Sequence, residues 1–393
     1  MDERTGLPVV GMIGAGQLAR MTHQAAIPLG QSLRLLADSP DDGAALVAAD
    51  VEVGDFRELA DLRRFARGCD VVTFDHEHVP NEHIAALEAD GVAVHPGSAA
   101  LRYAQDKLAM RERLSAMGVP GPRWAPVATR ADLERFGARV GWPLVLKAAT
   151  GGYDGKGVWV VDTADDAADV LAAGVRLLAE EKAPIARELA AVIARSPFGQ
   201  GAAWPVVETV QRDGICVEVL APAPDLDEDV AEQAQALALR IAAELGVTGV
   251  LAVELFETRD GLLVNELAMR PHNSAHWTIE GARTSQFEQH LRAVLDYPLG
   301  APTPTAPVTV MANLLGGADD VVPKGIDERV HHSMARWPDV KIHLYGKQLR
   351  PGRKVGHVTA LGVDLATVRG RARAAADYLM HGDLNSDANA AGA

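Results

Sequence analysis

The first hundred residues alternate apolar, strand-like segments with amphipathic, helix-like segments, and this alternation restricts the fold more than any other feature. LPVVGMIGAGQLARM predicts a strand, a tight glycine turn and a helix. SLRLLADSP, DVEVGDF, DVVTFDHEHVP and VAVHPG are strand-like, whereas ELADLRRFARGCD and NEHIAALEADG are helix-like. Such an order predicts a parallel sheet with helices on both faces. We therefore expect a Rossmann-like domain over residues 1–105.

The rest of the chain predicts mixed α+β structure. The pattern is helical from Leu101 to Met117, and a second helix precedes the strand PLVLK, the loop TGGYDGKG and the strand VWVV. We expect another helix over residues 164–179 and a long one at DVAEQAQALALRIAAELG. These elements suggest a central domain over 106–300 with a subdomain over 118–180, a C-terminal domain over 301–382, and a disordered tail over 383–393.

Composition argues against several kinds of partner. The formal net charge is −15 and no dense Lys/Arg run is present, which disfavours nucleic acid and anionic membrane surfaces. No apolar stretch reaches the length of about 20 residues that spans a bilayer, and the N-terminal apolar run is too short for a signal peptide. Two cysteines, Cys69 and Cys216, cannot form a disulfide framework. We expect a cytoplasmic protein that binds small molecules.

The first glycine loop, GAGQLA, leaves three alternatives open. Gly14, Gly16 and Ala19 match the dinucleotide-binding spacing after a strand, and Asp38 stands about 20 residues further on, where a ribose-binding acid belongs. The backbone N–H groups of such a turn also suit other anions. A tight strand-to-helix turn needs glycines for geometry alone. The loop is thus a dinucleotide site, a site for another anion, or a purely structural turn.

The second glycine loop, TGGYDGKG at residues 150–157, follows a strand that ends in Lys147. It is not a Walker A motif, because a strand rather than a helix follows it. A glycine-rich loop between two strands can lay its N–H groups over a polyphosphate, with Lys147 as a point charge beneath. The alternative is an ordinary hairpin with a surface lysine.

VELFETRDGLLVNEL predicts a β-hairpin that brings two glutamates together. With R-D-G as a three-residue loop and its glycine in the left-handed conformation, Glu254 pairs directly with Glu266. Carboxylates that face each other across strands repel. Mg²⁺, which takes one or two carboxylates together with substrate phosphates, would remove the repulsion. A register slip of one residue would instead place one acid in solvent.

Two clusters of hydrogen-bond donors follow the hairpin. LAMRPHNSAHW lies just beyond the proposed metal site and carries Arg270, His272, Asn273 and His276. KQLRPGRKVGH concentrates positive charge in an acidic chain through Lys347, Arg350, Arg353 and Lys354. The second cluster indicates an anion site, and its alternative is a solvated basic loop.

The order of several motifs resembles the 5-(carboxyamino)imidazole ribonucleotide synthases of the ATP-grasp superfamily. The motifs are AQDK (104–107), TGGYDGKG, NELAMRPHNSAHWT (265–278), SQFEQHLRA (285–293) and RPGRKVGH (350–357). The resemblance implies an ATP-grasp fold of α/β and α+β structure, with an N-terminal Rossmann-like (pre-ATP-grasp) domain and a small C-terminal domain. It also implies ATP-dependent carboxylation of 5-aminoimidazole ribonucleotide with bicarbonate, through carboxyphosphate, in de novo purine biosynthesis. ATP and Mg²⁺ would be the cofactors, and the protein would be a homodimer.

The resemblance also implies roles for individual residues. ATP would contact Lys107, Lys147, Gly152, Tyr153, Asp154, Gly155, Lys156, Gly157, Val158, the adenine hinge Glu180, Glu181, Lys182 and Ala183, and Glu188, Asn265 and Glu266. Mg²⁺ would be held by Glu254 and Glu266. The catalytic residues that orient bicarbonate and carboxyphosphate would be Arg270, His272, Asn273 and Lys354. Aminoimidazole ribonucleotide would contact Gln17, Leu18, Glu77, Tyr153, Asp154, Arg353 and Lys354.

The sequence departs from the family pattern at DHEHVP (75–80), at AEEKAP, and at Met269 and Ala275, where proline and glycine are usual. Three other functions compete with the carboxylase. The first is another ATP-grasp carboxylase or ligase, such as a formate-using transformylase. The second is a dehydrogenase that uses GAGQLA, and the third is a nucleotide sensor without catalysis.

Overall fold

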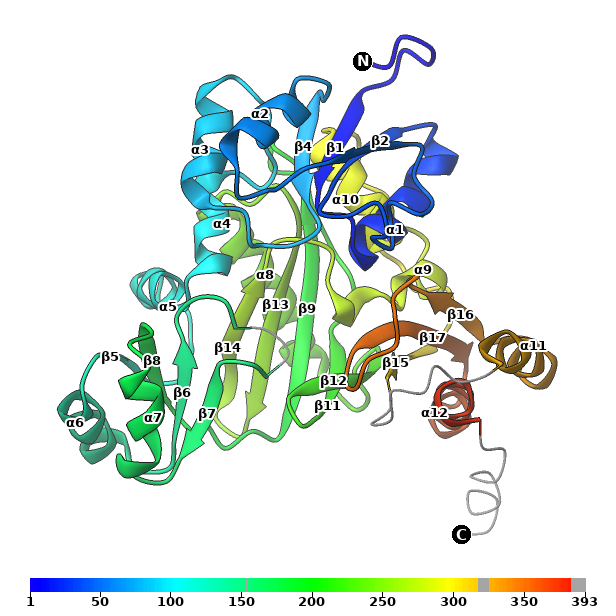
Figure 1. Ribbon diagram of the computed structural model, residues 1–393. Coiled ribbons are helices and arrows are strands. Elements are labelled where there is room, and N and C mark those ends of the chain that lie inside the picture. Colours follow the sequence, from blue (N-terminus) through cyan, green and yellow to red (C-terminus); the bar gives the residue numbers. More distant parts are fainter. Residues whose placement is uncertain (153–154, 317–324, 383–393) are drawn as a thin grey trace.

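The computed structural model describes residues 1–152, 155–316 and 325–382. Tyr153, Asp154 and the predicted tail over 383–393 lie outside the described residues. Three β-sheets and the helices around them make up the described fold (Figure 1).

The N-terminal part contains the predicted parallel sheet. Its strand order is β3 (Asp50–Val53), β2 (Ser32–Ala37), β1 (Val9–Ile13) and β4 (Val71–Phe74), and all pairs are parallel. The connecting helices are α1 (Gln17–Ala26) with η1 (Ile27–Leu29), α2 (Leu59–Ala66) and α3 (Asn81–Ala89). The strand predicted at VAVHPG is reduced to one bridge between Val72 and Val94, where the Val72 N–H donates to the Ala93 carbonyl and the His95 N–H donates to the Val72 carbonyl. This arrangement confirms the Rossmann-like prediction.

The helix predicted from Leu101 to Met117 is in fact two helices, α4 (Ser98–Gln105) and α5 (Lys107–Ala116). Asp106 separates them and caps α5, because its carboxylate accepts hydrogen bonds from the N–H groups of Leu108 and Ala109. The Lys107 N–H donates to the carbonyl of Ala149, at 2.8 Å. The break therefore places Lys107 beside the second glycine loop.

A small antiparallel sheet carries that loop. Its order is β5 (Trp124–Val127), β8 (Leu177–Glu181), β6 (Leu144–Ala148) and β7 (Val158–Val161). The helices α6 (Arg130–Val140) and α7 (Ala168–Ala172), with the short η2 (Asp165–Ala167), complete this unit. The helix predicted over 164–179 is wrong beyond Ala172. Gly174, with φ +68°, ends the helix, and the apolar residues from Leu177 form an inner strand instead.

The largest sheet in the described residues has nine strands. Eight follow the order β14 (Gly261–Ala268), β13 (Gly249–Thr258), β9 (Arg187–Arg195), β11 (Val207–Arg212), β12 (Ile215–Ala221), β15 (Val308–Leu315), β17 (Lys354–Gly362) and β16 (Lys341–Leu344), and β10 (Gly201–Ala203) pairs with β9. Because β12 pairs with β15, the sheet continues across residue 301. The domain boundary there stays a proposal.

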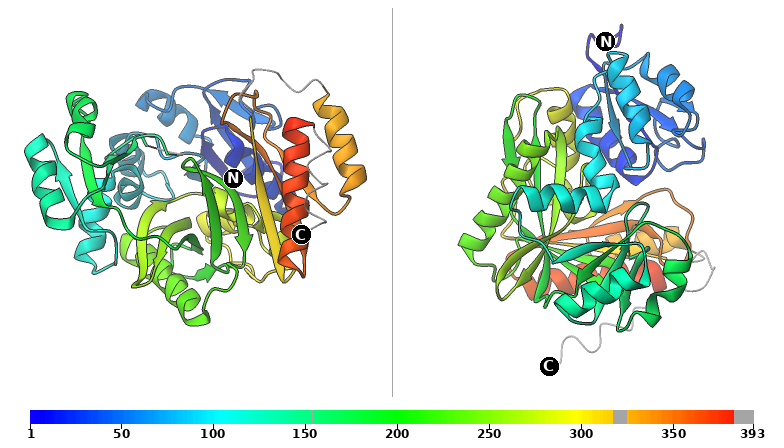
Figure 2. Two further views of the ribbon diagram at one scale, coloured as in Figure 1. Left: turned by 90° about the horizontal axis from the view of Figure 1, so that it is seen from below. Right: turned by 90° about the vertical axis from the view of Figure 1, so that its left-hand side faces the viewer.

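The remaining helices are α8 (Glu228–Leu245), η3 (Asn273–Ala275), α9 (Thr278–Gly281), α10 (Gln286–Val294), α11 (Ile326–Arg336) and α12 (Leu365–His381). One apolar core joins Ile13 and Phe65 of the N-terminal part to Leu251 and Ile241 of the large sheet and α8. Seen from below, the small sheet lies at one end of the molecule and the helices α11 and α12 lie at the other (Figure 2).

Candidate active site

The first glycine loop contacts an anion from its own chain. The carboxylate of Asp75, directly after β4, accepts hydrogen bonds from the N–H groups of Gly16 at 2.5 Å and Ala19 at 2.9 Å. A Cβ added at Gly16 would lie 2.5 Å from Asp75 Oδ2, and Gly14 has a φ of +99°, so both glycines are needed for this packing. Asp75 therefore takes two of the N–H groups that a dinucleotide would need.

The second glycine loop joins β6 to β7, as the strand pattern predicts, and Lys147 pairs with Val158 across that hairpin. Lys147 is not a surface lysine, because it is only 8% exposed. Its Nζ lies 2.8 Å from Glu180 Oε2 and donates to Asn265 Oδ1 at 2.8 Å. The surface lysine of the alternative interpretation is therefore wrong, and the phosphate-binding role of the loop stays a prediction.

Glu180 neutralises Lys147 and is held in place by Arg111. Arg111 donates from Nε to Glu180 Oε1 at 2.6 Å and from its two Nη atoms to the carbonyls of Val264 and Asn265. Burial raises the pKa of Glu180, but Lys147 and Arg111 outweigh it and hold the pKa below its ordinary value. Glu180, predicted in the adenine hinge, thus uses its side chain to hold a cation in place.

The predicted pairing of Glu254 with Glu266 is confirmed, but the predicted turn is wrong. Thr258 pairs with Gly261, so the turn has two residues, Arg259 and Asp260, rather than three. Gly261 has a φ of +120°, outside the left-handed helical region. A register shift after Glu254 leaves Asn265 without a partner in the ladder. This β-bulge adds the residue that the shorter turn removes, and the two acids meet again.

The bulge also turns two consecutive side chains toward the same cavity. Asn265 Nδ2 donates to Glu254 Oε2 at 3.3 Å, and Glu266 forms an ion pair with Lys107. In a regular strand these neighbours would lie on opposite faces. Burial raises the pKa of Glu254, and burial together with Lys147 lowers the pKa of Lys107 to about 8. The charges on this cluster are therefore closely coupled.

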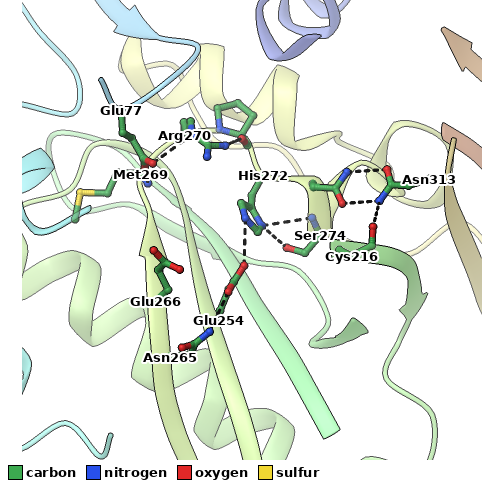
Figure 3. Close-up of polar contacts among 12 residues, drawn as sticks. Glu77, Cys216, Glu254, Asn265, Glu266, Met269, Arg270, His272, Ser274 and Asn313 are labelled. Carbon is green, nitrogen blue, oxygen red and sulfur yellow. Dashed lines mark hydrogen bonds and ion pairs between the residues drawn. The ribbon is translucent and has the colours of Figure 1, made fainter. Parts of the chain in front are cut away.

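His272 faces Glu254 across the site (Figure 3). Its Nε2 lies 3.4 Å from Glu254 Oε1, and its Nδ1 accepts a hydrogen bond from the N–H of Ser274. Nε2 therefore carries the proton and donates toward the carboxylate. Burial, helped by Arg270 and Lys354, lowers the pKa of His272 to about 3.

The other three residues of the donor cluster, Arg270, Asn273 and His276, contact different partners. Glu77 accepts a hydrogen bond from the Met269 N–H at 2.6 Å and lies 3.5 Å from Arg270 Nε. The Asn273 amide exchanges two hydrogen bonds with the amide of Asn313. His276 is different, since it lines neither cavity described below. It is fully buried beside Gln286 and the ring of His357.

Two cavities meet at the side chains around Glu254, Glu266 and His272. The first, of about 420 Å³, lies between the small and the large sheet. The second, of about 830 Å³, lies between the first glycine loop and the basic loop before β17. Six residues line both, namely Lys107, Glu254, Glu266, His272, Asn273 and Lys354. The predicted metal pair and three of the four predicted catalytic residues therefore stand at the junction.

The other predicted site residues divide between the cavities. The first cavity also contains Lys147, Gly155, Val158, Glu180, Glu181, Lys182, Ala183, Glu188 and Asn265. The second also contains Gln17, Leu18, Glu77, Gly152, Lys156, Arg270 and Arg353. Gly157 lines neither, although its φ of +74° shapes the second glycine loop. Tyr153 and Asp154 lie outside the described residues.

Sequence reasoning missed several contacts. Gln211 lines the first cavity and donates a hydrogen bond to Glu188, whose pKa burial and Glu254 raise to about 7. Lys347, predicted only as part of the basic cluster at a candidate anion site, donates from Nζ to Gln17 Oε1 at 2.5 Å. Arg111 and Asp75 were also missed. Arg111 and Gln211 lie outside every motif that was assigned a role, whereas Lys347 belongs to the basic cluster KQLRPGRKVGH, which indicated an anion site but not a contact with Gln17.

The residues fit a magnesium ion bound together with phosphates. The described residues contain no group of three or more His, Cys, Asp and Glu side chains that could hold a metal unaided. Glu254 and Glu266 nevertheless supply two facing carboxylates, and Mg²⁺ needs only one or two when waters and phosphates complete its shell.

No helix in the described part of the chain combines the length and apolar character needed to cross a bilayer.

Three family models match the chain in sequence order. They are the ribonucleotide synthetase preATP-grasp domain at residues 7–105, the ATP-grasp domain at 112–287, and the phosphoribosylaminoimidazole carboxylase C-terminal domain at 309–371. The predicted fold class, with an ATP-grasp domain between a Rossmann-like domain and a small C-terminal domain, is confirmed.

Two curated relatives cover nearly the whole chain. The N5-carboxyaminoimidazole ribonucleotide synthase of Mycobacterium tuberculosis is 62% identical over 95% of this chain and 88% of the relative. That of Corynebacterium ammoniagenes is 51% identical over 96% of this chain and 93% of the relative.

Two solved structures of N5-carboxyaminoimidazole ribonucleotide synthases are also similar to almost the whole chain. The N5-carboxyaminoimidazole ribonucleotide synthetase of Thermus thermophilus is 39% identical with a TM-score of 0.84, over 96% of this chain and 99% of that one. The Aspergillus clavatus enzyme, in complex with ADP and 5-aminoimidazole ribonucleotide, is 33% identical with a TM-score of 0.86, over 95% of this chain and 98% of that one. Sequence and structure agree along almost the entire length, and the chain belongs to the N5-carboxyaminoimidazole ribonucleotide synthase family.

Proposed function

We propose that this protein is an ATP-grasp ligase of purine biosynthesis. It uses ATP and bicarbonate to carboxylate 5-aminoimidazole ribonucleotide, giving the 5-carboxyamino product, ADP and phosphate. The observation that carries the proposal is the junction of two cavities at Lys107, Glu254, Glu266, His272, Asn273 and Lys354. A phosphoryl donor in one cavity and an amine acceptor in the other would share these residues.

ATP occupies the first cavity in this proposal. Lys147 and Lys107 stand beneath the second glycine loop and contact the phosphates, which the loop covers. The backbone of residues 180–183 holds the adenine, and Glu188 with Gln211 holds the ribose. The network of Arg111, Glu180 and Lys147 supports this placement, because it fixes a buried ammonium group in the lining of the first cavity.

The ribonucleotide occupies the second cavity. Gln17 and Leu18 approach it from one side, and Arg353 and Lys354 from the other. Glu77 lines the same cavity, where its carboxylate accepts a hydrogen bond from the Met269 N–H and lies beside Arg270. Positive charge on several elements suits the phosphate of a ribonucleotide.

The chemistry begins when a bicarbonate oxygen attacks the γ-phosphoryl group, which yields carboxyphosphate and ADP. Arg270, Asn273 and Lys354 orient the bicarbonate and stabilise the growing anion electrostatically. His272, neutral and with its proton on Nε2, donates a hydrogen bond rather than a charge. Glu254 and Glu266 would hold Mg²⁺, which supplies charge neutralisation at the phosphates.

The second half-reaction transfers the carboxyl carbon. Carboxyphosphate breaks down to CO₂ and phosphate within the closed site, and the exocyclic amine of the ribonucleotide attacks the CO₂. The second glycine loop must exclude water, because hydrolysis would waste the intermediate. No covalent intermediate with the enzyme is required. A homodimer stays a prediction of the resemblance, and a cytoplasmic location stays a prediction from the composition.

The test is ADP release with 5-aminoimidazole ribonucleotide and bicarbonate each present or omitted. The proposal expects strong release only with both, and an acid-labile carboxylated product. Release that ignores the ribonucleotide would retain the ATP-grasp fold but refute the substrate assignment. Formate in place of bicarbonate tests the transformylase alternative.

A further inference from the structure

Asp75 has no role in the proposed chemistry, yet its position is closely defined. It follows β4 directly, lines the second cavity and is only 9% exposed. A helix leaves its first four N–H groups without intrahelical partners, and in α1 these belong to Gly16, Gln17, Leu18 and Ala19. Asp75 accepts hydrogen bonds from the outer two, Gly16 and Ala19.

The inner two N–H groups therefore stay available. In the described part of the chain, the N–H groups of Gln17 and Leu18 have no acceptor outside their own helix. Both residues line the second cavity. The side chain of Gln17 points toward the basic loop, since its Oε1 accepts from Lys347 Nζ. Asp75 thus divides the donors of this turn between the protein and the cavity.

Gly14 and Gly16 of the first glycine loop leave the space that Asp75 occupies. The three atoms nearest to a Cβ added at Gly16 all belong to Asp75, the closest at 2.5 Å. A Cβ at Gly14 would lie 2.9 Å from both the Cβ of Asp75 and Cδ2 of the neighbouring His76. The dinucleotide-like spacing therefore makes room for a carboxylate of the chain.

We propose that Asp75 is a positioning residue for the ribonucleotide. Its carboxylate fixes the turn through the outer N–H groups, so that Gln17 and Leu18 keep a fixed orientation toward the substrate. This inference rests on the proposed function, because it assigns the second cavity to the ribonucleotide.

The test is a double-mutant cycle on full-length protein, with KM measured separately for the ribonucleotide and for ATP. Asp75→Ala removes the acceptor. Gly16→Ala keeps the acceptor but pushes it away, and the backbone of Gly16, with φ −82°, accommodates alanine. We expect either change to raise the KM for the ribonucleotide about tenfold, the scale of a lost charged acceptor at a helix start, with the KM for ATP unchanged.

The double variant separates positioning from general damage. Once Asp75 is alanine, the atoms that a Cβ at Gly16 would meet are gone, so the second change should add less than about twofold. Fully multiplied effects, a KM for ATP that rises in parallel, or a normal KM for the ribonucleotide in both single variants would overturn the proposal. If Asp75→Ala does not fold, Gly16→Ala still tests the same contact.

Asp70→Asn is the matched control. Asp70 lies at the other end of β4, where its carboxylate accepts from the Val9 N–H at 2.8 Å, and it lines neither cavity. It should leave both KM values unchanged. Ribonucleotide-dependent ADP release by the wild-type chain tests the proposed function separately. A failure of the proposed function can therefore be distinguished from a failure of the positioning role of Asp75.

Discussion

The two glycine loops differ in whether a carboxylate of the same chain occupies their N–H groups in the described residues. At the first loop, Asp75 of the same chain takes two of the helix-start N–H groups. The second loop joins two strands beside two buried lysines, and its residues line both cavities. Glycine spacing shows where a backbone can approach an anion closely. It does not show whether that anion is a ligand or a side chain, because both require the same space.

The largest effect should come from the acids below the second loop. Glu266→Gln removes one of two carboxylates proposed to hold Mg²⁺, and we expect ATP turnover to fall about a thousandfold or more. Thermal unfolding should change little, because Glu266 is partly exposed. Glu257→Gln is the control, since Glu257 lies on β13 but pairs with Arg187, away from both cavities. Near-normal turnover in Glu266→Gln would remove the metal site from this account.

Loss of the buried lysine should have the next largest effect. Lys147→Met should lower kcat/KM for ATP about a hundredfold, the scale of one preorganised electrostatic contact. Glu180 would keep Arg111 as its partner, so the protein should still fold. Lys182→Ala, at an exposed lysine of the same cavity, should cost no more than about threefold. Equal losses in the two variants would show that only overall charge matters.

A smaller effect tests the shape of the second loop. Gly157 and Gly174 have φ of +74° and +68°, so alanine at either position should cost about 1 kcal/mol of stability. Only Gly157→Ala should also raise the KM for ATP, about threefold to tenfold, because Gly174 lies beyond α7. Steady-state kinetics with thermal unfolding of both variants checks this. An unchanged KM for ATP in Gly157→Ala would make the loop a structural hairpin.

The smallest effect concerns the residue that made the first loop look like a dinucleotide site. Asp38 is exposed and lines neither cavity. Asp38→Ala should change the KM for the ribonucleotide by less than about twofold. NADH should not bind, as fluorescence titration would show. Saturable NADH binding that Asp38→Ala abolishes would restore the dinucleotide interpretation.

The fold was predictable where local patterns determine it. Alternating strands and helices identified the parallel sheet, and outward counting from the turn identified Glu254 and Glu266 as partners. That count succeeded because two errors cancelled: the turn is one residue shorter than predicted, and the bulge at Asn265 adds one back. Bulges depend on which side chains the surrounding structure must accommodate, so strand periodicity does not reveal them.

Side chains that hold the site together were not predictable, because their partners are distant in sequence. Arg111 meets Glu180 and the carbonyl groups at residues 264 and 265. Asp75 meets Gly16 and Ala19, more than fifty residues earlier. Each is an ordinary charged residue in its local segment. Motifs identify residues that contact ligands, whereas residues that hold other residues in position become visible only in the fold.

The central claim, that bicarbonate accepts the phosphoryl group where the two cavities meet, has one direct test. Wild-type protein is incubated with ATP, 5-aminoimidazole ribonucleotide and ¹⁸O-labelled bicarbonate, and the phosphate released is analysed by mass spectrometry. Carboxyphosphate contains the attacking bicarbonate oxygen between carbon and phosphorus, and its breakdown leaves that oxygen on phosphorus. We predict labelled phosphate in proportion to the carboxylated product. Unlabelled phosphate would contradict the account, because it would mean that bicarbonate never attacked ATP.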